Sequence, residues 1–143
     1  MPVIAAGLGS KAGPRVATPV DLHDVQVSLF AATGATWLQG RLGVPFQTIP
    51  VDEQDRVIFA EYHGHGTRGS SFMVRRGEWK LIYHVGAPQQ LFHLASDPVE
   101  LRNVYDACPT PAAALEAALR EVCSPEVGHA RAEAFIEAQL AAV

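Results

Sequence analysis

The sequence has few cysteines, no excess of basic residues and no long apolar run. Its 143 residues contain 2 Cys, and 11 Lys and Arg stand against 15 Asp and Glu, for a net charge of −4. This mild acidity argues against nucleic acid as the main partner, because phosphate binding needs a concentrated basic face. No apolar run approaches the roughly 18 to 20 residues that a membrane-spanning helix requires. We therefore expect neither nucleic acid nor a membrane as a partner.

The cysteines and the N-terminal sequence say little about the compartment. Cys108 and Cys123 bracket an expected helix of about 12 residues, whose ends would lie roughly 18 Å apart. A disulfide needs Cα atoms within about 7 Å, so we expect both thiols to stay reduced. The start of the chain has no basic region and only a short apolar stretch, which makes it a poor signal peptide. Localisation in the cytoplasm or the periplasm stays open.

The N-terminal part combines an expected strand with an expected helix. Residues 2–7 form an apolar run without polar alternation, which suits a strand covered on both faces. Thr18 and Pro19 predict the N-cap and first turn of a helix, and Gly34 its end. The apolar residues of this helix recur at spacings of three and four, which predicts one buried face made of Leu22, Val25, Leu29 and Ala32.

The middle of the chain predicts an antiparallel sheet. Residues 40–56 are rich in turn formers and polar residues, which indicates a linker. Four runs rich in β-branched and aromatic residues then follow at close spacing: 57–62, 71–76, 79–85 and 90–94. The Arg76-Gly77-Glu78 sequence predicts a tight hairpin. Alternation in the third run places Trp79, Leu81 and Tyr83 on one face, so we expect one well-buried face of the sheet.

The C-terminal part predicts three helix starts that share a cap-then-proline pattern. Asp97 precedes Pro98, with Glu100 at the capping-box position of a short helical turn. Thr110 precedes a second proline, and the helix that follows is expected to bury Leu115, Leu119 and Val122. The Ser124-Pro125 pair starts a third helix that runs toward Ile136 and Leu140.

The order and spacing of these segments resemble the sulfatases. Residues 91–103 read Leu-Phe-x-Leu-x-x-Asp-Pro-x-Glu-Leu-x-Asn, and residues 19–24 read Pro-Val-x-x-x-Asp. With the Arg-Gly-x-Trp-Lys hairpin at 76–80, these segments resemble the C-terminal subdomain of the formylglycine-dependent arylsulfatase and choline-sulfatase group, within the alkaline-phosphatase-like hydrolases. One position departs from the family pattern, because His93 stands where Asp is usual.

The resemblance implies a fold of the α/β class, which within this chain is α+β. Residues 1–45 would be the terminal strand and helix of an incomplete catalytic α/β domain, at the edge of its sheet. Residues 46–143 would be the C-terminal subdomain, a four-stranded antiparallel sheet with packed C-terminal helices.

The resemblance also implies a chemistry whose residues are absent from this chain. Sulfatases of this group use a formylglycine made from Cys or Ser in a C-x-P-S-R type motif, with Ca²⁺ or Mg²⁺ and nearby basic side chains. All those positions would precede the segment represented here. The Cys123-Ser124-Pro125 sequence begins like that motif but lacks its Ser and Arg. We therefore assign no catalytic residue, no metal ligand and no cofactor to this chain.

Histidines and basic residues near the strands are the remaining candidates. His63 and His65 flank a glycine in a loop that, by the resemblance, would lie at the rim of the substrate pocket; a plain polar turn is the alternative. Basic residues gather around the hairpin (Arg68, Arg75, Arg76 and Lys80), and a solvated face explains them better than substrate steering. His84 and His93 fall within strand runs, so we expect packed or edge positions rather than ligands.

Three functional hypotheses follow. In the first, the chain is the C-terminal portion of a sulfatase-like hydrolase whose complete form hydrolyses sulfate esters, and the chain is inactive alone. In the second, the complete enzyme is a phosphonate or phosphate monoester hydrolase of the same superfamily. In the third, the chain is a non-catalytic module that completes a partner chain, for example by strand addition at residues 2–7. The partner would be the missing N-terminal catalytic portion or a chain that supplies it, and a homo-oligomer stays open.

Overall fold

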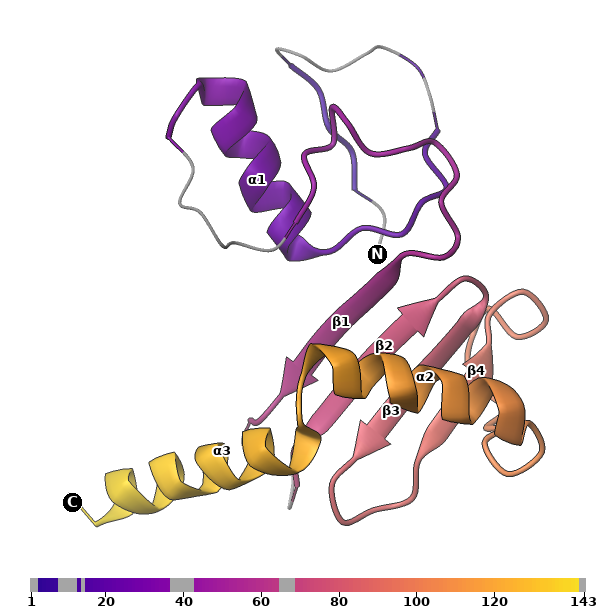
Figure 1. Cartoon of the computed structure of the whole chain (residues 1–143), viewed down its shortest axis with the longest axis vertical. Coiled ribbons are helices and arrows are strands. Elements are labelled where there is room, and N and C mark those ends of the chain that lie inside the picture. Colours follow the sequence, from indigo (N-terminus) through magenta and orange to yellow (C-terminus); the bar gives the residue numbers. More distant parts are fainter. Residues whose placement is uncertain (1–2, 8–12, 14, 37–42, 65–68, 142–143) are drawn as a thin grey trace. The chain divides into compact units, whose positions relative to one another are not determined.

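The chain forms two compact units, Met1–Arg56 and Val57–Val143, in a computed structural model. The structure describes residues 3–7, 13, 15–36, 43–64 and 69–141 (Figure 1). The first unit contains helix α1, and the second contains strands β1 to β4 and helices α2 and α3. None of the helices in the described ranges is long and apolar enough to cross a membrane.

Helix α1 (Leu22–Thr33) begins later than predicted. Its N-cap is Asp21, whose carboxylate accepts hydrogen bonds from His23 and Asp24, while Asp24 accepts one from the Asp21 N–H. The prediction of Thr18 as N-cap is wrong, because the Thr18 hydroxyl instead donates to the Pro50 carbonyl at 2.6 Å. The predicted end is confirmed, since Gly34 is the C-cap with a φ of 67°.

The predicted strand at residues 2–7 does not form in the part that the structure describes. Residues 3–6 have no regular secondary structure and are exposed, with Ile4 95% accessible. A strand needs a neighbour that pairs with its backbone N–H and C=O groups, and none of the described residues supplies one here. This apolar run therefore joins no sheet among the residues that the structure describes.

The predicted buried face of α1 is also wrong. The residues that α1 buries are Asp24, Val27 and Ser28, whereas Leu22 and Leu29 are 74% and 62% exposed. Residues 43–56 contain no helix or strand, as expected of a linker. They nevertheless form hydrogen bonds with the polar side of α1, and these bonds turn that side inward. The Val44 N–H donates to Asp24 at 2.8 Å, and the Phe46 N–H donates to Ser28 at 2.7 Å.

The predicted sheet is confirmed. Strands β1 (Val57–Tyr62), β2 (Ser71–Arg76), β3 (Trp79–His84) and β4 (Gln90–His93) pair antiparallel in the order β1-β2-β3-β4 (Figure 1). The β2–β3 hairpin turns at Gly77, whose φ of 58° is a left-handed conformation that glycine adopts without strain.

One face of the sheet forms the core of the second unit with α2 (Pro109–Val122), as Figure 1 shows. The sheet contributes buried residues from three strands: Phe72, Val74, Leu81 and Leu91. Helix α2 contributes Ala112, Leu115, Ala118 and Leu119. Trp79 and Tyr83 are partly buried against this cluster, which confirms the face predicted from alternation.

The C-terminal helices differ in detail from the prediction. Helix α2 starts at Pro109 behind Cys108, and Val122 is 44% exposed rather than buried, because it lies at the last turn beyond the edge of the core. Helix α3 (Pro125–Leu140) starts as predicted, with Ser124 as N-cap. Cys108 and Cys123 lie at opposite ends of α2 and are free thiols, as expected.

The predicted helical turn at Asp97 is a turn without a helix. The Asp97 carboxylate accepts hydrogen bonds from the N–H groups of Leu101 and Arg102, at 3.2 and 2.8 Å. Glu100 does not complete a capping box. It has a φ of 57°, which breaks the helical path, and its carboxylate pairs with Lys80 Nζ at 2.6 Å.

Candidate functional site

The best-defined polar cluster is centred on Ser70. The Ser70 side chain is buried, with 3% of the residue exposed. Its Oγ lies 2.7 Å from Nδ1 of His63 and 3.1 Å from Nδ1 of His129. A hydroxyl has one hydrogen to donate, so the two imidazoles cannot both accept from Ser70. At least one of the two rings must donate from Nδ1 for both contacts to be hydrogen bonds.

Carboxylates extend this cluster at both ends. Nε2 of His63 lies 3.4 Å from Glu61, and Nε2 of His129 lies 3.5 Å from Glu133. The result is a continuous polar chain from β1 through the start of β2 to α3. A ring that donates from Nδ1 to Ser70 and from Nε2 to its carboxylate carries a positive charge, which the neighbouring glutamate balances.

Each member of the cluster is placed by the end of an element. Tyr62 pairs with Ser71 at the last register position of β1 and β2, so His63 and Ser70 face each other just beyond it. His129 lies in the first turns of α3, where Gly128 lets the helix approach the sheet: a Cβ at Gly128 would lie 3.1 Å from Cζ of Phe72. The His63 ring also contacts Phe72 edge-on, with centroids 5.4 Å apart.

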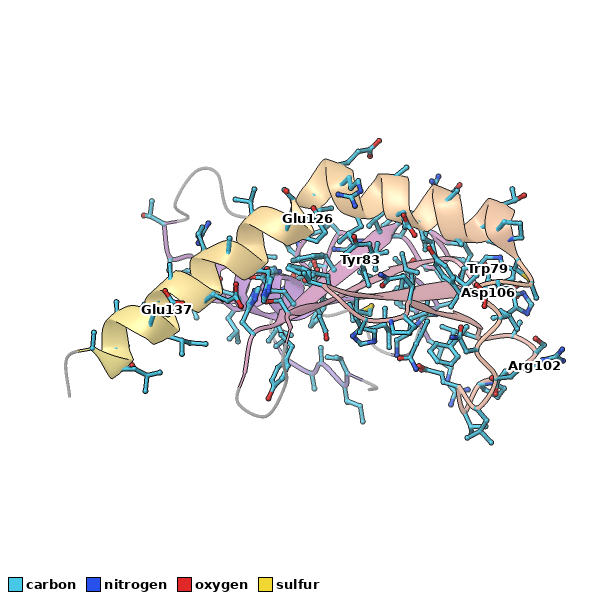
Figure 2. The ribbon with its side chains drawn as sticks, turned by 90° about the horizontal axis from the view of Figure 1, so that it is seen from below. Trp79, Tyr83, Arg102, Asp106, Glu126 and Glu137 are labelled. Carbon is cyan, nitrogen blue, oxygen red and sulfur yellow. The ribbon has the colours of Figure 1, made fainter. Side chains whose placement is uncertain are left out.

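A second polar cluster fixes where α3 starts. Figure 2 shows Glu126 at the beginning of α3, close to Tyr83 of the sheet. The Tyr83 hydroxyl donates to Glu126 at 2.9 Å, and Arg120 donates to both Glu126 oxygens at 3.0 Å. Hydrogen bonds from Arg120 are the main reason that the pKa of Glu126 falls to about 2. The Glu126 carboxylate therefore holds the corner between α2 and α3 while it is ionised.

A shallow pocket of about 200 Å³ opens beside Ser70. Its lining comes from the ends of β1 and β2 and from α3: His63, Gly64, Gly69, Ser70, His129, Ala132, Glu133, Ile136 and Glu137. These lining residues include two glutamates and no Lys or Arg. Within the described residues, the glutamate and histidine side chains of this lining can accept hydrogen bonds from a group such as a hydroxyl.

The structure describes one of the two predicted site residues. His63 lies in the pocket wall, whereas His65 lies outside the described residues. Ser70 and His129 were not predicted. Ser70 follows from the register of the β1–β2 pair, because it mirrors His63 across the last paired position. His129 was not predictable, since its approach depends on how α3 turns away from α2.

The basic residues of the hairpin are largely engaged in local contacts. Lys80 pairs with Glu100, and Arg75 donates to the Gly77 carbonyl at 3.3 Å; Arg68 lies outside the described residues. His84 contacts Ser71 Oγ at 2.8 Å, and the His93 ring lies 4.5 Å from the Trp79 ring between centroids. The expectation that these two histidines are packed or edge residues is confirmed.

The described residues do not fit the cofactors of the sulfatase reaction. Among them, no group of three or more His, Cys, Asp or Glu side chains could hold a metal ion. Cys123, which the sequence places in a motif-like context, ends α2 and is half-buried. Burial is the main cause that raises the pKa of its thiol, so the nucleophilic thiolate is disfavoured. We therefore derive no catalytic step from these residues.

Comparison with known proteins identifies relatives along most of the chain. No family model matches. Arylsulfatase K of Danio rerio is 31% identical over 134 residues, which cover 85% of this chain and 25% of that protein. Choline-sulfatase of Rhizobium meliloti (strain 1021) is 30% identical over 112 residues, which cover 74% of this chain and 21% of that protein. The chain thus spans about a quarter of the length of the curated relatives it matches.

Solved structures show the same fold. A Bacteroides thetaiotaomicron protein named as a candidate sulfatase superposes with a TM-score of 0.58 at 20% identity, covering 68% of this chain and 23% of that chain. Ps i-CgsB, solved in complex with k-i-k-neocarrahexaose, gives a TM-score of 0.51 at 20% identity, with 68% and 23% covered. In sequence and in fold, the chain corresponds to the C-terminal part of a sulfatase of the arylsulfatase and choline-sulfatase group.

Proposed function

We propose that this chain is the C-terminal portion of an enzyme that hydrolyses sulfate esters, and that the chain alone is inactive. The observation that carries the proposal is the extent of the match, because 85% of this chain aligns with 25% of an arylsulfatase. A match of that extent leaves three quarters of the relative without a counterpart here. The nucleophile and the Ca²⁺ or Mg²⁺ ligands would lie in the part of the complete enzyme that corresponds to those three quarters.

We propose further that His63 lies at the rim of the substrate pocket of the complete enzyme. The His63–Ser70–His129 cluster gives this position a fixed geometry, since Ser70 Oγ contacts both rings within 3.1 Å. The two glutamates in the pocket wall favour contact with hydroxyl groups of the alcohol part of the ester. The sulfate group itself would be held by the missing portion.

The isolated chain provides the test. We expect no hydrolysis of p-nitrophenyl sulfate or p-nitrophenyl phosphate above the buffer blank, with or without added Ca²⁺ and Mg²⁺. A control with Ser70→Ala should give the same blank rate. Turnover of either ester by the chain that Ser70→Ala abolishes would overturn the proposal, because it would place a complete catalytic site within these residues.

A further inference from the structure

Among the described residues, helix α3 is held to the rest of the second unit near its first turns. Pro125 is its one buried residue, and every residue from 133 to 140 is exposed. Figures 1 and 2 show this later part of the helix extending away from the sheet. The contacts near its start are the corner at Glu126 and the contact between His129 and Ser70. The docking of α3 on the sheet therefore depends on few interactions.

The His63–Ser70–His129 cluster lacks one hydrogen when both rings are neutral. A neutral imidazole has one N–H, so the ring that accepts from the Ser70 hydroxyl at Nδ1 carries its hydrogen on Nε2 and donates it to its glutamate. The other ring must donate from Nδ1 to Ser70. Its bare Nε2 then faces its own carboxylate, which is Glu61 at 3.4 Å or Glu133 at 3.5 Å. One contact of the cluster is therefore a lone pair against an anion.

A single added proton removes this mismatch. A ring that carries hydrogens on both nitrogens donates to Ser70 and to its glutamate at the same time, and both hydrogen bonds are charge-assisted. A second proton does not disrupt the cluster, because the Ser70 oxygen has two lone pairs and can accept from both rings. The cluster is thus fully hydrogen-bonded only when at least one of its two imidazoles is charged.

The surroundings of the cluster are compatible with a charged ring. The ionisable groups that the packed elements bring toward the two rings are Glu61 of β1, Tyr83 of β3, Arg120 and Cys123 of α2, and Glu133 and Glu137 of α3. Arg120 already donates to Glu126 and to the Tyr83 hydroxyl, and burial is the main cause that raises the pKa of the Cys123 thiol. Arg131 of α3 is exposed and does not line the pocket. Within the described residues, an imidazolium here therefore meets carboxylates and a cation that is already paired.

We propose that the His63–Ser70–His129 cluster docks α3 on the sheet in a proton-dependent way, with docking favoured when one of the two rings is charged. The proposal concerns this chain by itself and does not rest on the proposed function. Since α3 supplies one wall of the pocket beside Ser70, docking also forms that pocket.

The direction of the pH dependence follows from the count of protons. When α3 leaves the sheet, water satisfies each ring in either protonation state, so the docked state holds up to one more proton than the undocked state. A state that holds more protons loses stability as the pH rises. The docking of α3 should therefore weaken as the pH rises from about 6 to about 8, within the range in which histidine ordinarily loses its charge.

Hydrogen exchange of the chain between about pH 6 and about pH 8 tests this coupling. The readout is the protection of the amides around Gly128 and His129, relative to their intrinsic exchange rate at each pH. We expect this protection to fall roughly tenfold over that range, as for the loss of one hydrogen bond, while the amides around Leu115 of α2 keep theirs. Constant protection at α3 would overturn the proposal. An equal fall in α2 would also overturn it, because the whole unit would then be losing stability.

Two single variants distinguish the two-ring arrangement from the titration of one histidine. His63→Gln and His129→Gln each leave one ring, which can accept from the Ser70 hydroxyl while it is neutral. Each change alone should therefore abolish the pH dependence of the α3 amides. A pH dependence that survives in either variant would show that the requirement for a charge does not come from the pair of rings.

Two other histidines serve as controls. His93 also contacts a serine and a glutamate, Ser96 at 2.7 Å and Glu78 at 3.3 Å, but as a single ring. His93→Gln should leave the pH dependence at α3 unchanged. His65 lies outside the described residues, and His65→Gln should likewise have no effect. Loss of the pH dependence in either control would assign the proton to another group and overturn the proposal.

The nitrogen-15 shifts of the imidazole rings give a measurement on the unmodified chain. At every pH at which the α3 amides are protected, His63 or His129 should carry hydrogens on both ring nitrogens. Two neutral rings in a chain whose α3 amides remain protected would show that docking needs no charge, and this result would overturn the proposal.

Discussion

At the scale of single residues, Asp24 determines the structure of the first unit. Burial by itself works to raise the pKa of this carboxyl, but hydrogen bonds from Arg56 and from the N–H groups of Asp21 and Val44 outweigh it. The pKa of Asp24 is therefore below its ordinary value of 3.8. The sequence indicated Asp24 only through its place in the family pattern. Its partner Arg56 was not predicted, because nothing in the linker sequence shows which basic residue returns to the helix.

Removing the charge of Asp24 should unfold the first unit. Asp24→Asn leaves the Arg56 guanidinium, whose side chain is 14% exposed, without its anion. Breaking a buried pair in this way costs on the order of 3 kcal/mol. The measurement is hydrogen exchange of the α1 amides. Asp52→Asn, a change of the same chemistry at an exposed position, is the control and should leave exchange unchanged within about 0.5 kcal/mol. Equal exchange in both variants would contradict this role.

The lowered pKa of Asp24 also predicts an acid transition confined to the first unit. Because the folded-state pKa is depressed, the stabilisation is present above the unfolded value of 3.8 and is lost as the pH falls through the folded value. The protection of the α1 amides, measured relative to their intrinsic exchange rate at each pH, should therefore decrease as the pH falls below 3.8 and through the folded-state value. Asp24→Asn should remove this pH dependence. Persistence of the same acid transition in Asp24→Asn would show that another group controls it.

At the scale of elements, the alternation of apolar and polar residues was enough to predict the strands whose pairing strands are also in this chain. Strands β1 to β4 and the face that carries Phe72 and Leu81 were predicted correctly because hairpin neighbours are close in sequence. The orientations of the helices were harder to predict from the sequence. The orientation of α1 follows from polar bonds to residues 43–56 rather than from its apolar stripe. The path of α3 depends on Glu126 and His129, whose partners Tyr83 and Ser70 lie far away in the sequence.

Ser70 should anchor the start of α3 to the sheet. Ser70→Ala removes the contacts with both His63 and His129 and leaves two ring nitrogens without a partner in a half-buried pocket. The expected cost is about 1 to 2 kcal/mol, or roughly tenfold faster exchange of the amides around Gly128 and His129. Ser96→Ala is the matched control, because it removes a serine–histidine contact to His93 on the surface. No difference between the two variants would contradict the anchoring role.

At the scale of the whole molecule, the largest departures from the sequence prediction lie in the first unit. The apolar run at residues 2–7 has no partner strand among the described residues, and the apolar residues Leu22 and Leu29 of α1 are exposed. Both patterns suit a larger α/β layer. The second unit, by contrast, folds around its own core, as its sequence predicts.

The coding sequence upstream of the Met1 codon tests most directly whether these residues belong to a longer sulfatase, as we propose. We predict an in-frame continuation that carries a C-x-P-S-R type motif and Asp-rich segments for the metal. A stop codon just upstream, followed by a ribosome-binding site, would contradict this claim. The chain would then be encoded separately, as a module that completes a partner chain.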